Sequence, residues 1–256
     1  MKKYALIGER LGHSYSPFVH NEIYKDLNID AEFTLLECKK EELGEVINLL
    51  RKGSYQGFNV TFPYKIEVMQ YLDDISPEAK AVGSVNTVFY RDGRVIGYNT
   101  DVYGFYAELL YFKVPVKDKE CYILGTGGAS LAVHKALEDL GGRVHYVSRT
   151  KRDGVITYSE LEDKKIDVLV NATPVGLYPN SDACPCKPEI AMKASYVLDV
   201  IFNPRITKIL EYGGSVMNGL FMLVYQAIKS EEIFQHTKYE FDARDLLDRL
   251  EASLNE

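Results

Sequence analysis

The fold of this chain is decided by a glycine-rich stretch, Leu124-Gly125-Thr126-Gly127-Gly128-Ala129-Ser130. A short apolar run at 121–124 precedes it and an amphipathic segment at 129–140 follows, which predicts a strand, a turn and a helix. In such a turn glycines let the backbone approach a pyrophosphate, which the positive end of the helix attracts. The match to G-x-G-x-x-G is imperfect because its last position is Ser130, so an ordinary glycine-rich turn is the alternative. The strand–turn–helix context favours a dinucleotide site.

The end of the next predicted strand, at 143–147, indicates which dinucleotide binds. An NAD site usually places Asp or Glu about 20 residues after the glycines, where it binds the ribose hydroxyls. Here the strand runs into Ser148-Arg149-Thr150-Lys151-Arg152, which carries cations and hydroxyls but no acid. A 2′-phosphate is held by a guanidinium and a hydroxyl and repelled by a carboxylate. The sequence therefore favours NADP over the alternative, a basic surface turn.

Strand-like and helix-like segments alternate along most of the chain, which predicts an α/β fold with mainly parallel sheets. Asp92-Gly93 is typical of a hairpin turn and predicts an antiparallel ribbon in the first half. Pro17 fits the first turn of a helix, and Thr100 or Asp101 fits a helix N-cap. The predicted strands lie at 4–8, 31–37, 57–61, 88–90, 94–96, 121–124, 143–147, 166–170 and 196–200. The predicted helices lie at 17–27, 40–51, 102–111, 129–140, 217–228 and 242–254.

The length of 256 residues accommodates two domains, with a boundary expected near residues 100–118. We expect an N-terminal α/β substrate-binding and catalytic domain with a mostly parallel sheet, formed by 1–101 plus 236–256. Residues 102–235 are expected to form a C-terminal Rossmann-like NADP domain. In this arrangement the last helix folds back onto the first domain.

Composition and charge argue against several classes of protein. The net charge of −7 gives no sign of a basic stripe for nucleic acid, and no run of about 18 apolar residues could span a membrane. The apolar run at the start is too short for a signal peptide, so the expected location is the cytoplasm. The four cysteines include one close pair, Cys184 and Cys186, with no histidine nearby, so we expect reduced thiols and no metal site.

Small polar residues follow several predicted strands in the first half of the chain. Hydroxyls, amides and a Lys/Asp pair suit a small polyhydroxylated anion. Taken singly, each residue also fits a structural role, because serines cap helices, Asn and Thr form turns, a lysine can be exposed and an aspartate can be a plain N-cap. The residues are Ser14, Ser16, Asn59, Thr61, Lys65, Asn86 and Asp101.

These residues belong to longer motifs that occur in order along nearly the whole chain. In the first half the motifs are Gly12-His13-Ser14-Tyr15-Ser16-Pro17 with His20-Asn21, Asn59-Val60-Thr61-Phe62-Pro63-Tyr64-Lys65, Gly83-Ser84-Val85-Asn86-Thr87 and Gly97-Tyr98-Asn99-Thr100-Asp101. In the second half they are 125–130, Arg149-Thr150, Asn171-Ala172-Thr173, 199–207 and 219–226. Together they resemble the NADP-dependent shikimate dehydrogenase family. The Asn-x-Thr-x-Pro-x-Lys and Asn-Thr-Asp motifs carry most of that resemblance.

By that resemblance, Lys65 and Asp101 are the catalytic pair. The resemblance assigns substrate binding to Ser14, Ser16, Asn59, Thr61, Asn86, Phe202 and Gln226. It assigns NADP binding to Gly125, Thr126, Gly127, Gly128, Ala129, Ser148, Arg149, Thr150, Lys151, Arg152, Thr173, Val200 and Gly219. The family commonly has Tyr where Phe202 stands, so one substrate-side hydroxyl is missing and we expect weaker carboxylate binding. It also commonly has Ala where Thr126 and Ser84 stand, and Asn where Ser148 stands.

The resemblance implies NADPH-dependent, reversible reduction of 3-dehydroshikimate to shikimate, a step towards chorismate and the aromatic amino acids. Hydride transfer leaves negative charge on the carbonyl oxygen, which Lys65 would stabilise and protonate while Asp101 orients the lysine. One alternative is a quinate/shikimate dehydrogenase with relaxed cofactor use, and another is a non-catalytic NADP-binding sensor. The expected partner is a small-molecule substrate, with no nucleic acid or membrane, and the chain is expected to be a monomer or homodimer.

Overall fold

The computed structural model describes residues 1–12, 14–239 and 243–254, and it divides into two compact units. The first unit comprises Met1–Gly104 and Leu223–Glu256, and the second comprises Phe105–Met222. The first expected boundary, after residue 101, lies close to the observed one. The second, after residue 235, lies further from it, because the helix residues Ser230 and Glu231 hydrogen-bond to side chains of the first unit. His13, which belongs to one of the motifs, and Asp242, the first residue of a predicted helix, lie outside the described residues.

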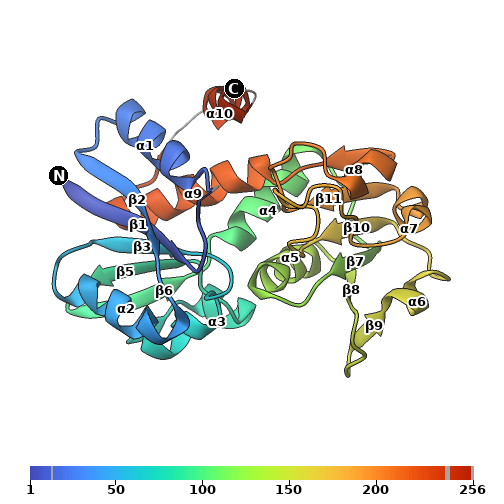
Figure 1. The fold of residues 1–256 in the computed structure, drawn as a ribbon, viewed down its shortest axis with the longest axis horizontal. Coiled ribbons are helices and arrows are strands. Elements are labelled where there is room, and N and C mark those ends of the chain that lie inside the picture. Colours follow the sequence, from blue (N-terminus) through green and yellow to red (C-terminus); the bar gives the residue numbers. More distant parts are fainter. Residues whose placement is uncertain (13, 240–242, 255–256) are drawn as a thin grey trace. The chain divides into compact units, whose positions relative to one another are not determined.

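The first unit contains a six-stranded sheet in the order β2-β1-β3-β5-β6-β4 (Figure 1). Its strands are β1 (Lys2–Gly8), β2 (Ala31–Glu37), β3 (Gly57–Val60), β4 (Asp74–Ile75), β5 (Thr87–Arg91) and β6 (Arg94–Tyr98). β1 pairs in parallel with β2 and β3, and β4 with β6, whereas β5 runs antiparallel to β3 and β6. The predicted hairpin is confirmed, and φ is 51° at Asp92 and 80° at Gly93, as a tight two-residue turn requires.

Helices cover both faces of this sheet because successive side chains of β1 point to opposite faces. Tyr4 and Leu6 pack with side chains from α1 and α9, whereas Ala5 and Ile7 pack with side chains from α2 and α3. The helices concerned are α1 (Ser16–Asp26), α2 (Leu43–Arg51), α3 (Pro77–Val82) and α9 (Leu220–Gln235). The unit also holds the 3-10 helices η1 (Lys40–Glu42) and η2 (Glu67–Tyr71), and α10 (Ala243–Leu254), which is ion-paired to α1.

The second unit contains a six-stranded sheet in the order β12-β11-β10-β7-β8-β9, and its neighbouring strands pair in parallel (Figure 1). Its strands are β7 (Glu120–Leu124), β8 (Arg143–Ser148), β9 (Val155–Thr157), β10 (Val168–Asn171), β11 (Tyr196–Asp199) and β12 (Ser215–Met217). This is the doubly wound order of dinucleotide-binding domains, so the predicted Rossmann-like domain is confirmed. The order reverses between β7 and β10, and in such sheets ligands bind outside the carboxyl ends of the strands at that point.

Helices pack on this sheet as well. Tyr122 and Leu124 of β7 lie in a cluster with side chains from α6, α7 and α8, and α5 packs against β7 and β8. The helices of this part of the chain are α4 (Asp101–Tyr111), α5 (Gly128–Asp139), α6 (Tyr158–Leu161), α7 (Pro188–Lys193) and α8 (Lys208–Tyr212). No described helix combines the length and the apolar character needed to cross a membrane.

The start of the helix predicted at 217–228 is wrong, because Met217 is the last residue of β12 and α9 begins at Leu220. Between them, Gly219 is pressed against the end of β11. Its N–H donates to the carbonyl of Ile201 (3.0 Å), and a Cβ at this position would lie 2.1 Å from the carbonyl oxygen of Val200. The apolar pattern of the sequence does not distinguish the end of the edge strand β12 from the start of α9, because only tertiary contacts separate the two elements.

Candidate active site

Lys65 and Asp101, the predicted catalytic pair, are in contact within the first unit. Lys65 Nζ lies 2.5 Å from Asp101 Oδ2, and the two side chains are only 15% and 7% exposed. Lys65 lies in the turn after β3, where its carbonyl oxygen accepts a hydrogen bond from Val85 N–H (2.8 Å). The predicted cap of α4 at Thr100 or Asp101 is provided instead by Asn99, whose Oδ1 accepts from the third backbone N–H along (3.1 Å). Lys65 is therefore not an exposed lysine, and Asp101 is not a plain helix cap.

The strand order brings this pair to one edge of the first sheet. β3 and β5 are antiparallel, with Asn59 opposite Thr87, and β5 and β6 are antiparallel, with Thr87 opposite Tyr98. β1, β3 and β6 therefore end at the edge where β5 begins. The loops at this edge, and the first residues of the helices α1 and α4 that follow them, carry Ser14, Ser16, Thr61, Lys65, Asn86 and Asp101. Carboxyl ends of strands that meet at one edge form the usual ligand site of an α/β sheet.

Asn86 connects the Lys65–Asp101 pair to its surroundings. Its Nδ2 donates to Asp101 Oδ1 (2.9 Å) and lies 3.4 Å from Gln226 Oε1, while its Oδ1 accepts from the backbone N–H of Thr100 (2.7 Å). Since Oδ2 of Asp101 already bonds Lys65, both carboxylate oxygens are occupied. The carboxylate is thereby held in one orientation. The ammonium of Lys65 uses one of its three N–H donors on Asp101, and the described residues leave the other two for a ligand.

Asn59 is a buried amide with one unpartnered atom. Its Nδ2 lies 2.9 Å from Ser230 Oγ, 3.0 Å from Thr87 Oγ1 and 3.2 Å from the carbonyl oxygen of Asn86. Its Oδ1 is also buried, yet no described residue bonds to it. Leaving a buried acceptor unpaired costs on the order of 1–3 kcal/mol. An acceptor kept in this state suits a site where a ligand supplies the donor.

Three buried hydroxyls that are not among the predicted site residues lie beside these amides: Thr87, Thr100 and Ser230. Their Oγ atoms are 3.0–3.2 Å apart. Thr87 and Thr100 lie inside two of the motifs, next to the predicted site residues Asn86 and Asp101. The only sequence signal for Ser230 was its spacing of four from Gln226, which places both on one face of a helix.

Ser14, Ser16 and Thr61 lie at the same sheet edge but outside this network. Ser14 Oγ donates to Ser16 Oγ (3.2 Å) and accepts from the backbone N–H of Ser16 (3.3 Å). Thr61 is half-buried, and its N–H continues the β1–β3 pairing by donating to the carbonyl of Ile7 (3.0 Å). Within the described part of the chain, none of the three hydroxyls bonds to Lys65. They form a second polar group at this edge.

In the second unit, the glycine-rich loop follows β7 where the strand order reverses. Gly125 has a φ of 107°, and a Cβ there would lie 3.0 Å from Thr173 Cγ2 in the loop after β10. α5 begins directly after Gly127, whose backbone is extended. Ser130, at the imperfect motif position, donates its hydroxyl to the carbonyl of Gly127 (2.6 Å) and so supports the loop. A tight turn that leads into the first turn of a helix, with the loop after β10 packed against it, fits a pyrophosphate.

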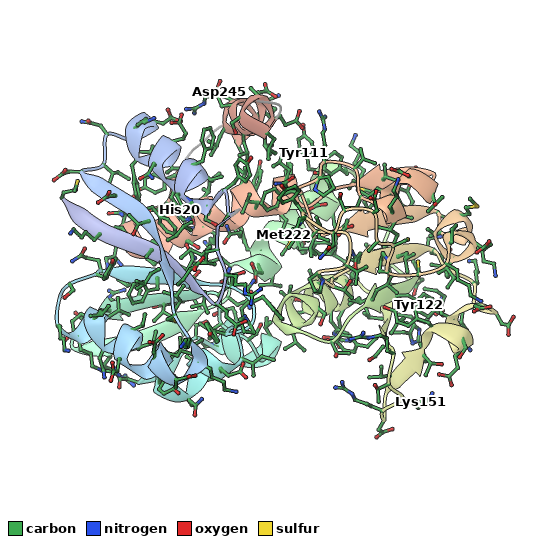
Figure 2. The ribbon with its side chains drawn as sticks, in the orientation of Figure 1. His20, Tyr111, Tyr122, Lys151, Met222 and Asp245 are labelled. Atoms are coloured by element: carbon green, nitrogen blue, oxygen red, sulfur yellow. The ribbon has the colours of Figure 1, made fainter. Side chains whose placement is uncertain are left out.

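The basic residues after β8 are not equivalent. Lys151 Nζ lies 2.6 Å and 2.9 Å from the two carboxylate oxygens of Glu160, and this hydrogen-bonded ion pair lowers the pKa of Glu160 to about 2. Arg149 and Arg152 are exposed, and neither guanidinium is hydrogen-bonded or ion-paired to a described residue. Ser148 Oγ accepts from the N–H of Thr150 (3.3 Å). Figure 2 shows Lys151 on the connection that leaves β8. The two arginines, rather than the lysine, are therefore available to an anion.

Of the remaining predicted residues of this unit, Gly219 follows β12, whereas Val200 and Phe202 follow β11. Asp199, its last residue, is buried and accepts from Thr207 Oγ1 (2.6 Å) and from the N–H of Ile201 (2.9 Å). Burial raises the pKa of Asp199 to about 7 despite these bonds. The backbone of Val200 lies so close to Gly219 that a side chain at position 219 would clash with it. Phe202 lies in this unit too, whereas the other predicted substrate residues lie in the first.

This chain is similar to known proteins along almost its full length. A family model described as the shikimate dehydrogenase substrate binding domain matches residues 6–88. A relative from Clostridium beijerinckii, named shikimate dehydrogenase (NADP(+)), is 42% identical over 254 residues, 94% of each protein. The crystal structure of shikimate dehydrogenase 1 from Peptoclostridium difficile matches with a TM-score of 0.94 and 38% identity over 99% of each chain. Shikimate 5-dehydrogenase from Thermus thermophilus, solved with NADP(H) and shikimate, matches with a TM-score of 0.83 and 29% identity over 94% of this chain and 95% of its own.

Proposed function

This chain belongs to the shikimate dehydrogenase family, and we propose that it catalyses the reversible, NADPH-dependent reduction of 3-dehydroshikimate to shikimate. The observation that carries the proposal is the 2.5 Å contact between Lys65 Nζ and Asp101 Oδ2 at a sheet edge lined with amides and hydroxyls. That edge offers a proton donor beside many hydrogen-bonding groups. A non-catalytic NADP sensor needs the glycine loop but has no use for such a pair.

Lys65 acts where negative charge develops. NADPH supplies the hydride to the ring carbonyl carbon. The ammonium of Lys65 stabilises the charge on the carbonyl oxygen and delivers a proton to it from Nζ. Asp101 accepts a hydrogen bond from the same Nζ and keeps it in position, while Asn86 fixes the carboxylate. In the reverse direction the lysine removes the proton from the substrate hydroxyl.

The substrate is held by the polar groups at the edge of the first sheet. Asn59, Asn86 and Gln226 bond the ring hydroxyls, since amides both donate and accept. The hydroxyls of Ser14, Ser16 and Thr61 form the second polar group and bond the carboxylate. Phe202 has no hydroxyl to offer a carboxylate, so we assign carboxylate binding to these residues of the first unit.

The second unit holds NADP. The turn at Gly125, Thr126 and Gly127, with Gly128 and Ala129 in the first turn of α5, receives the pyrophosphate. The guanidinium groups of Arg149 and Arg152, together with the hydroxyls of Ser148 and Thr150, bind the 2′-phosphate. Lys151 contributes less than its charge suggests, because Glu160 neutralises it. Thr173, Val200 and Gly219 line the site at the ends of β10 and β11.

We place the enzyme in the cytoplasm, where thiols stay reduced. The four cysteines are free in the structure, including Cys184 and Cys186.

A spectrophotometric assay tests the proposed function. The protein is mixed with shikimate and NADP, and the NADPH absorbance band is followed. Steady NADPH formation supports the proposal, and no turnover of any hydroxylated cyclohexene acid contradicts it. Parallel assays with quinate and with NAD decide between this activity and a quinate/shikimate dehydrogenase with relaxed cofactor use.

A further inference from the structure

Three buried hydroxyls form a triangle near the edge of the first sheet that carries Lys65 and Asp101. Thr87 Oγ1 and Thr100 Oγ1 each lie 3.0 Å from Ser230 Oγ and 3.2 Å from each other. Their exposed fractions are 0%, 1% and 0% for Thr87, Thr100 and Ser230. They come from β5, the start of α4 and the middle of α9, so the triangle joins three distant parts of the chain.

The hydroxyl proton of Ser230 is donated to a backbone carbonyl of the same helix, α9. Ser230 Oγ lies 2.9 Å from the carbonyl oxygen of Gln226, which can only accept, so the serine donates there. Towards its other neighbours Ser230 Oγ is therefore an acceptor. It receives a hydrogen bond from Asn59 Nδ2 (2.9 Å) and another from Thr100 (3.0 Å).

This arrangement fixes which end of the Asn59 amide faces the triangle. The Nδ2 of Asn59 has three acceptors around it, namely Ser230 Oγ, Thr87 Oγ1 and the carbonyl oxygen of Asn86. If the amide were reversed, its oxygen would meet a carbonyl oxygen and a serine whose proton is used elsewhere. The reversed amide is therefore disfavoured, and Oδ1 is left as a buried acceptor to which no described residue bonds.

We propose that Ser230 is a positioning residue for the substrate: it holds the Asn59 amide so that Oδ1 accepts a hydrogen bond from one ring hydroxyl. This inference rests on the proposed function, because it requires a polyhydroxylated substrate at Asn59. Ser230 acts through Asn59 and does not itself touch the substrate. Without its hydroxyl, Nδ2 of Asn59 loses its shortest hydrogen bond and the amide is free to turn.

The test compares Ser230→Ala with a matched control, Ser253→Ala. Ser253 lies in α10 and also donates to a helix carbonyl, that of Leu250 (2.8 Å), away from the triangle. We expect Ser230→Ala to raise KM for shikimate by roughly two- to tenfold, the effect of one lost hydrogen bond. KM for NADP and kcat stay near the wild-type values, and Ser253→Ala behaves as wild type.

A second readout separates positioning from general loss of structure. Shikimate analogues that each lack one ring hydroxyl are assayed with the wild type and with Ser230→Ala. For the hydroxyl that meets Asn59, we expect the wild type to prefer shikimate over the analogue and the variant to lose most of that preference. Thr87→Val, which removes a second acceptor of Nδ2, is expected to change the preference in the same direction.

Three outcomes overturn the inference. An unchanged KM for shikimate in Ser230→Ala contradicts it while leaving the proposed function intact. Equal losses for shikimate, all analogues and NADP indicate a purely structural serine. Wild-type protein without turnover of shikimate overturns the proposed function, and this inference with it.

Discussion

His20 Nδ1 lies 2.6 Å from Glu231 Oε1, and both side chains are fully buried in the first unit. The pair joins α1 to α9, and Figure 2 labels His20 at its place on α1. Tyr24 donates its hydroxyl to the same oxygen (2.8 Å), and Gln235 Nε2 donates to the other oxygen (3.2 Å). The buried carboxyl group is therefore hydrogen-bonded at both oxygens, as a buried polar group requires. The helix that carries Ser230 and Gln226 is held to α1 by this group.

Replacing Glu231 by alanine is expected to destabilise the protein strongly. Three polar groups, on His20, Tyr24 and Gln235, would lose their shared acceptor inside the core. Removing one partner of a buried pair costs about 3–5 kcal/mol of unfolding free energy, which urea unfolding measures. Glu45→Ala, an exposed change in α2, serves as the control and is expected to shift stability by about 0.5 kcal/mol or less. Equal effects of the two substitutions would show that the buried group adds no stability.

Replacing Lys65 by alanine is expected to lower kcat by a factor of about 10²–10⁴, because the proton donor is lost. KM for shikimate should change less, since the amides and hydroxyls of the site remain. Lys52→Ala, which removes an exposed lysine of the same unit, is the control. Steady-state rates followed by NADPH absorbance measure the effect. A kcat near the wild-type value for Lys65→Ala would contradict the role of this residue.

Asp101→Asn separates charge from shape at the same position. Both oxygens of Asp101 accept hydrogen bonds, one from Lys65 and the other from Asn86. An amide must turn its NH₂ group towards one of these donors, so the bond from Lys65 or the bond from Asn86 is lost. In either orientation Lys65 also loses the negative charge that holds its ammonium in place. We expect a large fall in kcat with native-like stability in urea. Full kcat in this variant would show that the orientation of Lys65 does not depend on the carboxylate.

The parts of the fold that the sequence predicted are those encoded locally. Gly125 with its flanking strand and helix, and Asp92-Gly93 with its hairpin, can be recognised because each needs residue types at adjacent positions. The order of the second sheet follows from such units, since parallel βαβ connections permit few arrangements. Lys65 and Asp101 were recognisable only through motifs, because their contact depends on the edge where β3 and β6 end.

The missed residues depend on long-range packing. Ser230 and Glu231 stand in a polar run of α9, Lys229-Ser230-Glu231-Glu232, and nothing in that run indicates that these two residues are buried. Their partners Asn59 and His20 lie far away in the chain, at separations of 171 and 211 residues. The start of α9 was misplaced for a related reason, because the closeness of Gly219 to Val200 is a tertiary contact.

Arg149 and Lys151 are expected to differ in their effect on the cofactor. The guanidinium of Arg149 has no ion pair within the described chain, whereas Lys151 is bonded to Glu160. We expect Arg149→Ala to raise KM for NADP on the order of tenfold or more, the effect of a lost charge-assisted hydrogen bond. Lys151→Ala, the matched control, should change it less, and neither should change KM for NAD, which has no 2′-phosphate. Similar losses in the two variants, or an equal rise in KM for NAD, would contradict this assignment.

Glu108 of α4 is a buried acid in the second unit that the proposed reaction does not use. Within the described residues, no donor lies within hydrogen-bond geometry of either of its carboxylate oxygens. Burial raises its pKa well above the usual value of 4.5; the backbone N–H of Met222 offsets this only in part, and the nearby carboxylate of Asp199 adds to it. The folded protein therefore holds a proton on Glu108 at pH values where the unfolded chain has released it.

The stability of the protein should fall with rising pH because of this residue. The folded-state pKa of Glu108 is raised, so its contribution to stability is fully present below pH 4.5 and is lost as the pH rises through the folded-state pKa. Glu108→Gln cannot ionise, so urea unfolding at a series of pH values should show a flatter curve for the variant, which becomes the more stable protein at the alkaline end. Glu45→Gln, in which an exposed acid is replaced, should keep the wild-type slope. Parallel curves for the wild type and Glu108→Gln would mean that Glu108 ionises equally in the folded and unfolded chains, and that water reaches this carboxylate.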